Sequence, residues 1–427
     1  MAVEHRLTET RSGVRVVTEA MPGVRSAALG FFIGTGSRSE REPQAGLSHL
    51  LEHLLFRGTA RFRSEEIDQI FDAMGAELNA GTGKETTSVY SRVLDRHLPR
   101  AFEVMVDMVF APALDDVEPE REVVLEEIAM YEDEPQEKVF DVLGEAVFGD
   151  HPLGRAIIGR AEVIADTPVQ EIAAFHSARY QPSNVVVAAA GSIDHGALVA
   201  MVEEAVPGTG ARTGDVLDDG GVPTFAPRTR FASKATEQVH VCLGGYGLAR
   251  DDDRRFALRV LDGIFGGTSS SRLFQEVREK RGLAYAVYSF TGGYAGTGQI
   301  GLYLGTRSDN LAEGLRVIGS ELHRLVEEPA TEQELERSKE NVKGRAVLSL
   351  ESTATRMGRL GSSIITGVPV LSVDELIERI DAVTLEDLRA VAVELFAPGR
   401  LSAAGVGGDE DRFRAALEPV SAELVAA

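Results

Sequence analysis

Apolar residues along the chain follow two different spacings, and these predict both strands and helices. Some runs are rich in β-branched residues and end in turn-forming residues, which is typical of strands. They span residues 13–20, 26–36, 86–94 and 184–191. Other runs repeat apolar residues every three or four positions, as helices do. They span residues 45–56, 64–75, 98–110 and 119–134. Because the two kinds do not alternate strictly, we expect an α+β fold with helices packed on mostly antiparallel sheets.

The pattern of the first half returns in the second half. Residues 24–59 and 237–268 each contain a strand-like run, a charged loop, a helical run and a Phe-x-Gly-Thr ending. The two endings lie about 210 residues apart, which indicates two tandem homologous domains and not a solenoid. Residues 208–229 are rich in Gly, Pro and Asp and lack an apolar period, so we expect a linker there. The predicted domains are therefore residues 1–207 and 230–427.

Composition and charge exclude several classes of protein. The chain has 427 residues, of which 43% are hydrophobic, and its net charge is −23. This charge argues against a nucleic-acid-binding protein, which needs a basic face. No stretch reaches the roughly 18–20 uncharged apolar residues of a membrane span, and the first residues lack the apolar core of a signal peptide. A single cysteine, Cys242, forms no internal disulfide, so we expect a cytoplasmic location without membrane association.

The most informative motif is His49-Leu-Leu-Glu52-His53 within the predicted helix 45–56. Residues four apart lie on one helix face, so the imidazoles of His49 and His53 can reach one Zn²⁺ ion. Glu52 lies on the same side, where its carboxylate can act on a bound water. His-x-x-Glu-His is the inverted zinc-peptidase pattern. The alternative is two surface histidines and a glutamate on an amphipathic helix.

A catalytic zinc site needs a third protein ligand, and helix 119–134 offers one. Glu120 and Glu127 are seven residues apart and share a face with Val124. Glu127 also follows Val123 by four residues, which favours an apolar side, whereas Glu126 points toward solvent. We therefore predict Glu127 as the third ligand and Glu120 as an outer carboxylate that holds a ligating histidine. For an isolated acidic helix, two surface glutamates would be the better interpretation.

With these motifs, the sequence resembles the M16 zinc peptidases, which include pitrilysin, insulin-degrading enzyme and mitochondrial processing peptidase. The length and the tandem halves match the small members related to the β subunit of the processing peptidase, with the M16/LuxS-like metallohydrolase fold. The resemblance implies one zinc per chain on His49, His53 and Glu127, with Glu52 as general base and Glu120 as support. It implies a zinc-dependent endopeptidase that acts on peptides or unfolded segments.

The second half adds Arg278 and Tyr285, seven residues apart in a Gly-rich context. In the family such a pair binds the peptide and steadies the reacting carbonyl. Aligning the Phe-x-Gly-Thr endings puts Leu258, Leu261 and Asp262 opposite His49, Glu52 and His53, and Lys343 aligns with Glu127. The second domain is therefore expected to be an inactive sister without zinc.

The resemblance also implies how substrate binds. Asn79 and Ala80 match a family edge strand that pairs with the substrate backbone. The alternative is the start of an ordinary strand. In relatives, the Arg/Tyr pair comes from the two-domain unit that does not hold the zinc. We therefore expect a homodimer in which Arg278 and Tyr285 serve the partner protomer. The alternative is a non-catalytic M16-like structural or partner subunit, although such members typically lose part of the zinc motif.

Overall fold

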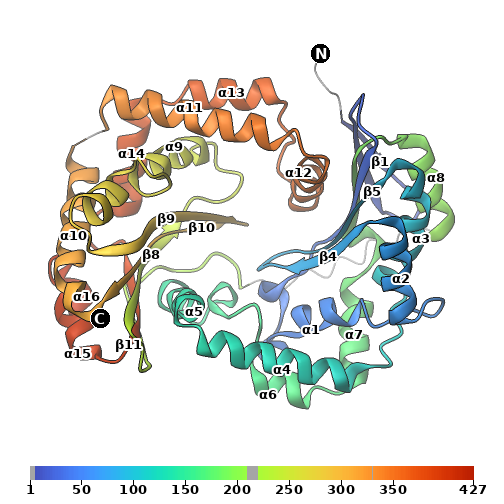
Figure 1. The fold of residues 1–427 in the computed structure, drawn as a ribbon, viewed down its shortest axis with the longest axis horizontal. Coiled ribbons are helices and arrows are strands. Elements are labelled where there is room, and N and C mark those ends of the chain that lie inside the picture. Colours follow the sequence, from blue (N-terminus) through green and yellow to red (C-terminus); the bar gives the residue numbers. More distant parts are fainter. Residues whose placement is uncertain (1–4, 209–219, 329) are drawn as a thin grey trace. The chain divides into compact units, whose positions relative to one another are not determined.

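The computed structural model describes residues 5–208, 220–328 and 330–427, which form two compact units (Figure 1). Unit 1 comprises residues 1–128, 156–219 and 347–372, and unit 2 comprises residues 129–155, 220–346 and 373–427. Half of the predicted linker, residues 209–219, lies outside the described residues. The domain boundaries at 207 and 230 therefore stay a prediction.

Unit 1 is built on a six-stranded sheet of order β1-β2-β6-β3-β5-β4. Its strands are β1 (Arg6–Glu9), β2 (Arg15–Ala20), β3 (Ser26–Ile33), β4 (Glu77–Thr82), β5 (Thr87–Leu94) and β6 (Val185–Gly191). Only β2 and β6 pair in parallel, and the other neighbours are antiparallel. The strand β4 pairs with β5 alone, so it forms one edge of the sheet.

Helices cover both faces of this sheet, so the central strand β3 is apolar on both sides. Alternate β3 residues, such as Leu29 and Phe31, pack under a layer of helices from the first half of the chain. These helices are α1 (Leu47–Leu54), α2 (Ser64–Met74), α3 (Leu98–Phe110), α4 (Val117–Asp133), α6 (Ala161–Asp166), α7 (Val169–Arg179) and α8 (His195–Ala205). The opposite face of β3, including Phe32, packs against α12 (Thr353–Thr366). A Cβ at Gly361 of α12 would lie 2.1 Å from the Phe32 ring, so glycine permits this close approach.

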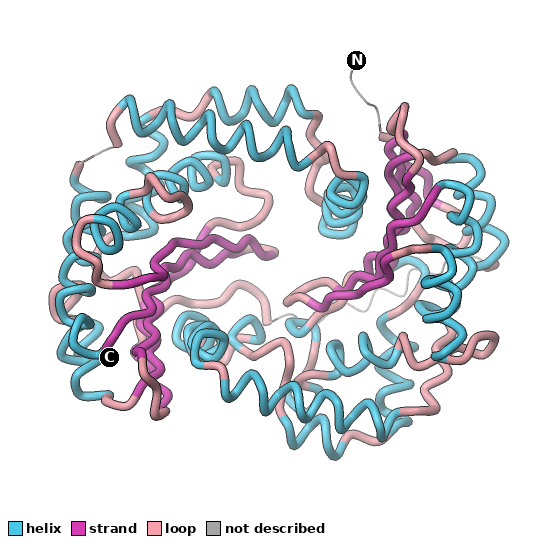
Figure 2. Tube along the Cα trace, viewed as in Figure 1, coloured by secondary structure: helices cyan, strands magenta, loops and turns pink. Residues whose placement is uncertain are grey.

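Unit 2 repeats the same sheet without the first strand, in the order β7-β11-β8-β10-β9. The strands of both units are drawn in magenta in Figure 2. Its strands are β7 (Thr229–Ser233), β8 (Gln238–Gly247), β9 (Ala284–Tyr294), β10 (Thr297–Arg307) and β11 (Ser402–Gly407). The pair β7–β11 is parallel and the others are antiparallel, as in β2-β6-β3-β5-β4 of unit 1. This match confirms the predicted α+β class with two mostly antiparallel sheets and packed helices.

One face of the unit 2 sheet is covered by α5 (Pro135–Phe148), which lies in the first half of the sequence. The remaining helices come from the second half. They are α9 (Arg255–Phe265), the π-helical turn η6 (Phe274–Glu279), α10 (Leu311–Glu327), α11 (Glu332–Ser349), α13 (Val373–Asp381), α14 (Leu385–Phe396), α15 (Glu410–Ala416) and α16 (Ala422–Ala426). Each unit thus takes one sheet-covering helix from the other half of the chain, which the tandem pattern did not indicate.

Candidate metal centre

Helix α1 carries the His-x-x-Glu-His motif and is fixed by its core contacts and by its N-terminus. Leu50, Leu51 and Leu54 are fully buried, which turns the opposite side of the helix toward the site. Gly46 precedes the helix with φ +104°, a backbone conformation that glycine adopts without strain. The buried carboxylate of Glu40 accepts hydrogen bonds from the Gly46 N–H (2.9 Å) and the Ser48 N–H (2.7 Å). A carboxylate at this end also complements the helix dipole.

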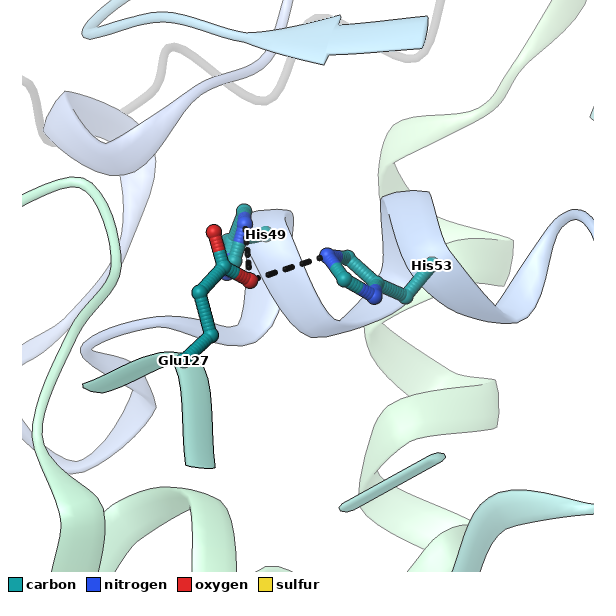
Figure 3. A group of neighbouring side chains, drawn as sticks. All are labelled: His49, His53 and Glu127. Carbon is teal, nitrogen blue, oxygen red and sulfur yellow. Dashed lines mark ion pairs between the residues drawn. The ribbon is translucent and has the colours of Figure 1, made fainter. Parts of the chain in front are cut away.

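His49, His53 and Glu127 converge on one point of unit 1, as Figure 3 shows. Glu127 Oε2, from α4, lies 3.6 Å from His49 Nε2 and 3.4 Å from His53 Nε2. Both separations exceed an ordinary hydrogen bond. A tetrahedral Zn²⁺ with ligands at about 2.1 Å would separate its ligand atoms by about 3.4 Å. The donor set of two imidazoles and one carboxylate and its spacing therefore both fit a zinc ion.

Glu120 holds the second imidazole from behind. Its Oε1 lies 2.7 Å from His53 Nδ1, and its Oε2 accepts from Arg57 Nε. The carboxylate is almost completely buried. By accepting a hydrogen bond from the Nδ1–H group, Glu120 favours the tautomer in which His53 Nε2 carries a lone pair toward Glu127. The structure therefore brings the Glu120 carboxylate against the imidazole of His53.

The charge state of His49 suits metal binding. Burial lowers the pKa of His49 to about 4, and the neighbouring His53 adds to the effect. The imidazole is therefore neutral at physiological pH, as a metal ligand must be. Its buried Nδ1 has no hydrogen-bond partner among the described residues.

Glu52 points to the same side of α1 but is held by the edge strand β4. Its Oε2 accepts a hydrogen bond of 2.5 Å from Thr82 Oγ1. Burial raises the pKa of Glu52, and the hydrogen bonds from Thr82 oppose that rise. Burial also raises the pKa of the nearby Tyr180 phenol, with a contribution from the charge of Glu52. A carboxylate with a raised pKa is suited to accept and return a proton near neutral pH.

Asn79 and Ala80 lie in the middle of β4. They pair with Tyr90 and Val89 of β5, and the other edge of β4 has no partner strand among the described residues. The Asn79 side chain accepts from the Ala80 N–H at 2.8 Å. An edge strand of this kind can receive an extended peptide as an additional strand.

Arg278 and Tyr285 belong to unit 2, where they contact each other. Arg278 lies in η6, and Tyr285 lies at the start of the edge strand β9. The Arg278 guanidinium stacks 4.5 Å from the centre of the Tyr285 ring and donates to the Tyr285 carbonyl at 3.0 Å. The Tyr285 side chain is highly exposed. Both groups are thus available to a ligand.

Unit 2 replaces the metal-site positions with other contacts. Leu258 and Leu261 of α9 are buried core residues. Asp262 accepts a hydrogen bond from Ser289 Oγ, and Lys343 pairs with Asp381 at 2.7 Å. Among the described residues, the His49, His53 and Glu127 cluster is the only group with metal-ligand spacing.

Two local expectations need correction. Helix α4 begins at Val117 and not at Pro119. Val123 does not lie on the apolar side, because its side chain is 46% exposed, whereas Val124 is fully buried. The apolar stripe of α4 runs through Val117, Val124 and Ile128. Glu127 lies at the border of this stripe and Glu126 is exposed, as predicted.

Sequence reasoning missed the residues that support the motif from a distance. They are Glu40, Arg57 and Thr82. The hydrogen bond between Arg57 and Glu120 joins residues that are 63 apart in the sequence. The one between Thr82 and Glu52 joins residues that are 30 apart. Of these residues, only Glu40 could have been recognised from the sequence, because it is an acidic residue shortly before the start of a predicted helix.

Comparison with known proteins identifies relatives that cover most of the chain. The family model described as Insulinase (Peptidase family M16) matches residues 15–161, and the one described as Peptidase M16 inactive domain matches residues 167–342. A protein of Streptomyces coelicolor named an uncharacterized zinc protease is 42% identical, with 91% of this chain and 86% of the relative covered. The uncharacterized zinc protease YmxG of Bacillus subtilis is 40% identical, with 90% and 94% covered.

Solved structures share the fold. A protease from Helicobacter pylori matches with a TM-score of 0.87 at 21% identity, and 95% of this chain and 100% of the other are covered. A structure titled as a peptidase M16 inactive domain from Pseudomonas fluorescens matches with a TM-score of 0.85 at 22% identity, with 95% and 99% covered. Among the described residues, no helix has the length and apolar character needed to cross a membrane. On the evidence of its two family models and its relatives, the chain belongs to the M16 peptidase family.

Proposed function

We propose that this protein is a zinc-dependent endopeptidase that hydrolyses peptides or unfolded protein segments. The observation that carries the proposal is the convergence of His49, His53 and Glu127, with Glu52 on the same helix. The names of the relatives, which call them zinc proteases, support it. In this proposal residues 1–207 form the catalytic domain and residues 230–427 an inactive domain.

When bound, one Zn²⁺ supplies a Lewis acid that makes water more acidic and polarises the scissile carbonyl. His49, His53 and Glu127 would hold it, and the hydrogen bond to Glu120 would keep His53 in the tautomer whose Nε2 faces the ion. The Glu52 carboxylate accepts the proton of the attacking water and later returns it to the nitrogen of the leaving amine. Burial keeps bulk water from solvating Glu52 fully, which is why its pKa is raised.

The substrate would bind as an added strand on β4, along Asn79 and Ala80. Main-chain hydrogen bonds give affinity in this mode without requiring a particular side-chain sequence. A peptide must be extended to bind in this way, so folded proteins would be poor substrates.

Arg278 and Tyr285 would hold the peptide and stabilise the developing oxyanion. We propose that they act in a homodimer, each pair serving the zinc site of the partner protomer. Mixing two inactive variants, Glu52→Gln and Tyr285→Phe, would then restore part of the activity. Each mixed dimer would contain one intact site, with Glu52 from one protomer and Tyr285 from the other. No recovery in mixed dimers that are shown to form would contradict the shared site.

The alternative is a non-catalytic M16-like structural or partner subunit. The complete set of His49, Glu52, His53 and Glu127 disfavours it. We also propose a cytoplasmic location, since the one cysteine, Cys242, is a buried free thiol.

The direct test incubates an unstructured peptide mixture with the purified protein and identifies the products by mass spectrometry. Cleavage that disappears with a zinc chelator and returns with added Zn²⁺ is the expected result. No cleavage by zinc-loaded dimeric protein would favour the non-catalytic alternative.

A further inference from the structure

Thr82 is the last residue of the edge strand β4, and its side chain reaches Glu52 of α1. The Thr82 hydroxyl donates to Glu52 Oε2 at 2.5 Å. The orientation of the Glu52 side chain therefore depends on where β4 ends.

The Thr82 hydroxyl has one proton and a choice of two acceptors. The second acceptor is the Ser48 carbonyl oxygen, at 3.4 Å. The shorter distance and the negative charge of the carboxylate both favour Glu52. The hydroxyl therefore donates to the Glu52 carboxylate in this structure. This bond fixes the Glu52 side chain, and not only the position of β4 against the backbone of α1.

This contact links substrate binding on β4 to proton transfer by Glu52. The strand that would receive the substrate backbone is β4, and the group that would handle the proton is Glu52. Thr82 belongs to the first and hydrogen-bonds to the second. Misplacing a reacting group by about 1 Å can cost about 100-fold in rate, so a direct link between strand and carboxylate is valuable.

A similar link in unit 2 shows that its mere presence does not prove a catalytic role. There Ser289 Oγ, from the edge strand β9, donates to Asp262 Oδ1 of α9 at 2.5 Å. Asp262 occupies the position that aligns with His53, and unit 2 has no metal-site residues among these positions. A test of Thr82 must therefore separate positioning from general stability.

We propose that Thr82 is a positioning residue that holds the Glu52 carboxylate in register with a substrate strand bound to β4. This inference rests on the proposed function, because it takes Glu52 as the general base. Thr82 would act through Glu52, because the hydrogen bonds of its side chain that the structure describes go to Glu52 and to the Ser48 carbonyl, and not to the proposed metal ligands.

The test compares Thr82→Val, which keeps the shape but removes the hydroxyl, with Thr82→Ser, which keeps the hydroxyl. Thr82→Val should lower kcat by about 10- to 100-fold, with KM within about twofold and zinc content unchanged. Thr82→Ser should recover most of kcat. Thr229→Val is the matched control, because it removes another buried hydroxyl, which donates to the Leu424 carbonyl at 2.6 Å, and should leave kcat unchanged.

A second readout needs neither zinc nor activity. In metal-free protein, Thr82→Val should lower the urea midpoint when Glu52 is present and have a smaller effect in a Glu52→Ala background, because coupled pairs are not additive. Equal effects in both backgrounds would overturn the proposed contact.

The outcomes separate the two claims. If Glu52→Gln is inactive and Thr82→Val keeps wild-type kcat, the positioning role is wrong while the proposed function stands. If Glu52→Gln itself keeps wild-type turnover, Glu52 is not the base and the proposed function is wrong.

Discussion

The Glu120 carboxylate lies 2.7 Å from His53 Nδ1, and it is the most deeply buried acidic group beside the proposed metal site. A buried carboxylate is stable only when its charge is compensated. Arg57 and the His53 N–H provide that compensation. The hydrogen bond between Glu120 and His53 thus fixes the tautomer of the imidazole before any ion binds. This lowers the free-energy cost of assembling the site.

Removing this carboxylate should weaken metal binding without removing a ligand. Glu120→Ala leaves His49, His53 and Glu127 in place but frees the His53 ring to change tautomer and orientation. We expect the zinc affinity to fall by about 10- to 100-fold, as for other outer partners of metal ligands. Competition with a chromophoric chelator measures this. Glu126→Ala, an exposed position on the same helix, is the control, and an equal loss in both variants would contradict the role of Glu120.

The low pKa of His49 makes the stability of the metal-free protein depend on pH. The pKa is about 4 in the folded protein against an ordinary value of 6.5. Between these values the unfolded chain binds a proton that the folded protein does not, so stability falls as pH drops from 6.5 toward 4. When the pH has fallen to about 4, protonation of His49 in the unfolded chain has lowered the free energy of unfolding by about 3 kcal/mol. Urea unfolding of wild type and His49→Gln across this range should show a shallower slope in the variant. Identical slopes would show that His49 is not buried in its neutral form.

The helices α5 and α12 each cover the sheet formed by the other half of the chain. We therefore predict that the two halves do not fold separately. A fragment of residues 1–208 lacks α12, so Phe32 and Val186 of the unit 1 sheet lose the cover of Met357 and Leu360. This apolar surface would face water, which destabilises the fragment and favours aggregation. We expect the fragment alone to be insoluble or partly unfolded by circular dichroism and gel filtration. Co-expression with residues 220–427 should yield a soluble complex. A stably folded, monomeric fragment would contradict this expectation.

Local elements could be predicted from the sequence because their own residues determine them. The periodic run 98–110 coincides with α3, and 64–75 differs from α2 by one residue. The His-x-x-Glu-His motif could be placed on a helix because leucines recur at helical spacing within and after it. In the structure Leu50, Leu51, Leu54 and Leu55 are buried. The duplicated pattern was also sufficient to predict two related sheets, since it recurs in the order of the strands.

Features that depend on distant packing could not be predicted. Nothing in the sequence of α5 or α12 indicates that the helix packs on the sheet formed by the other half of the chain. Val123 and Val124 look alike in the sequence, yet only Val124 faces the core. Arg57 and Thr82 are ordinary polar residues until the fold brings them to Glu120 and Glu52.

The measurement that tests the central claim most directly compares Glu52→Gln with wild type for both zinc content and peptide cleavage. The glutamine keeps the size of the side chain and can still accept from Thr82, but it cannot take a proton at neutral pH. Our account predicts one Zn²⁺ per chain in both proteins and a loss of cleavage of at least about 100-fold in the variant, the scale of general-base catalysis. A zinc-loaded Glu52→Gln protein that cleaves peptides at the wild-type rate would contradict the account.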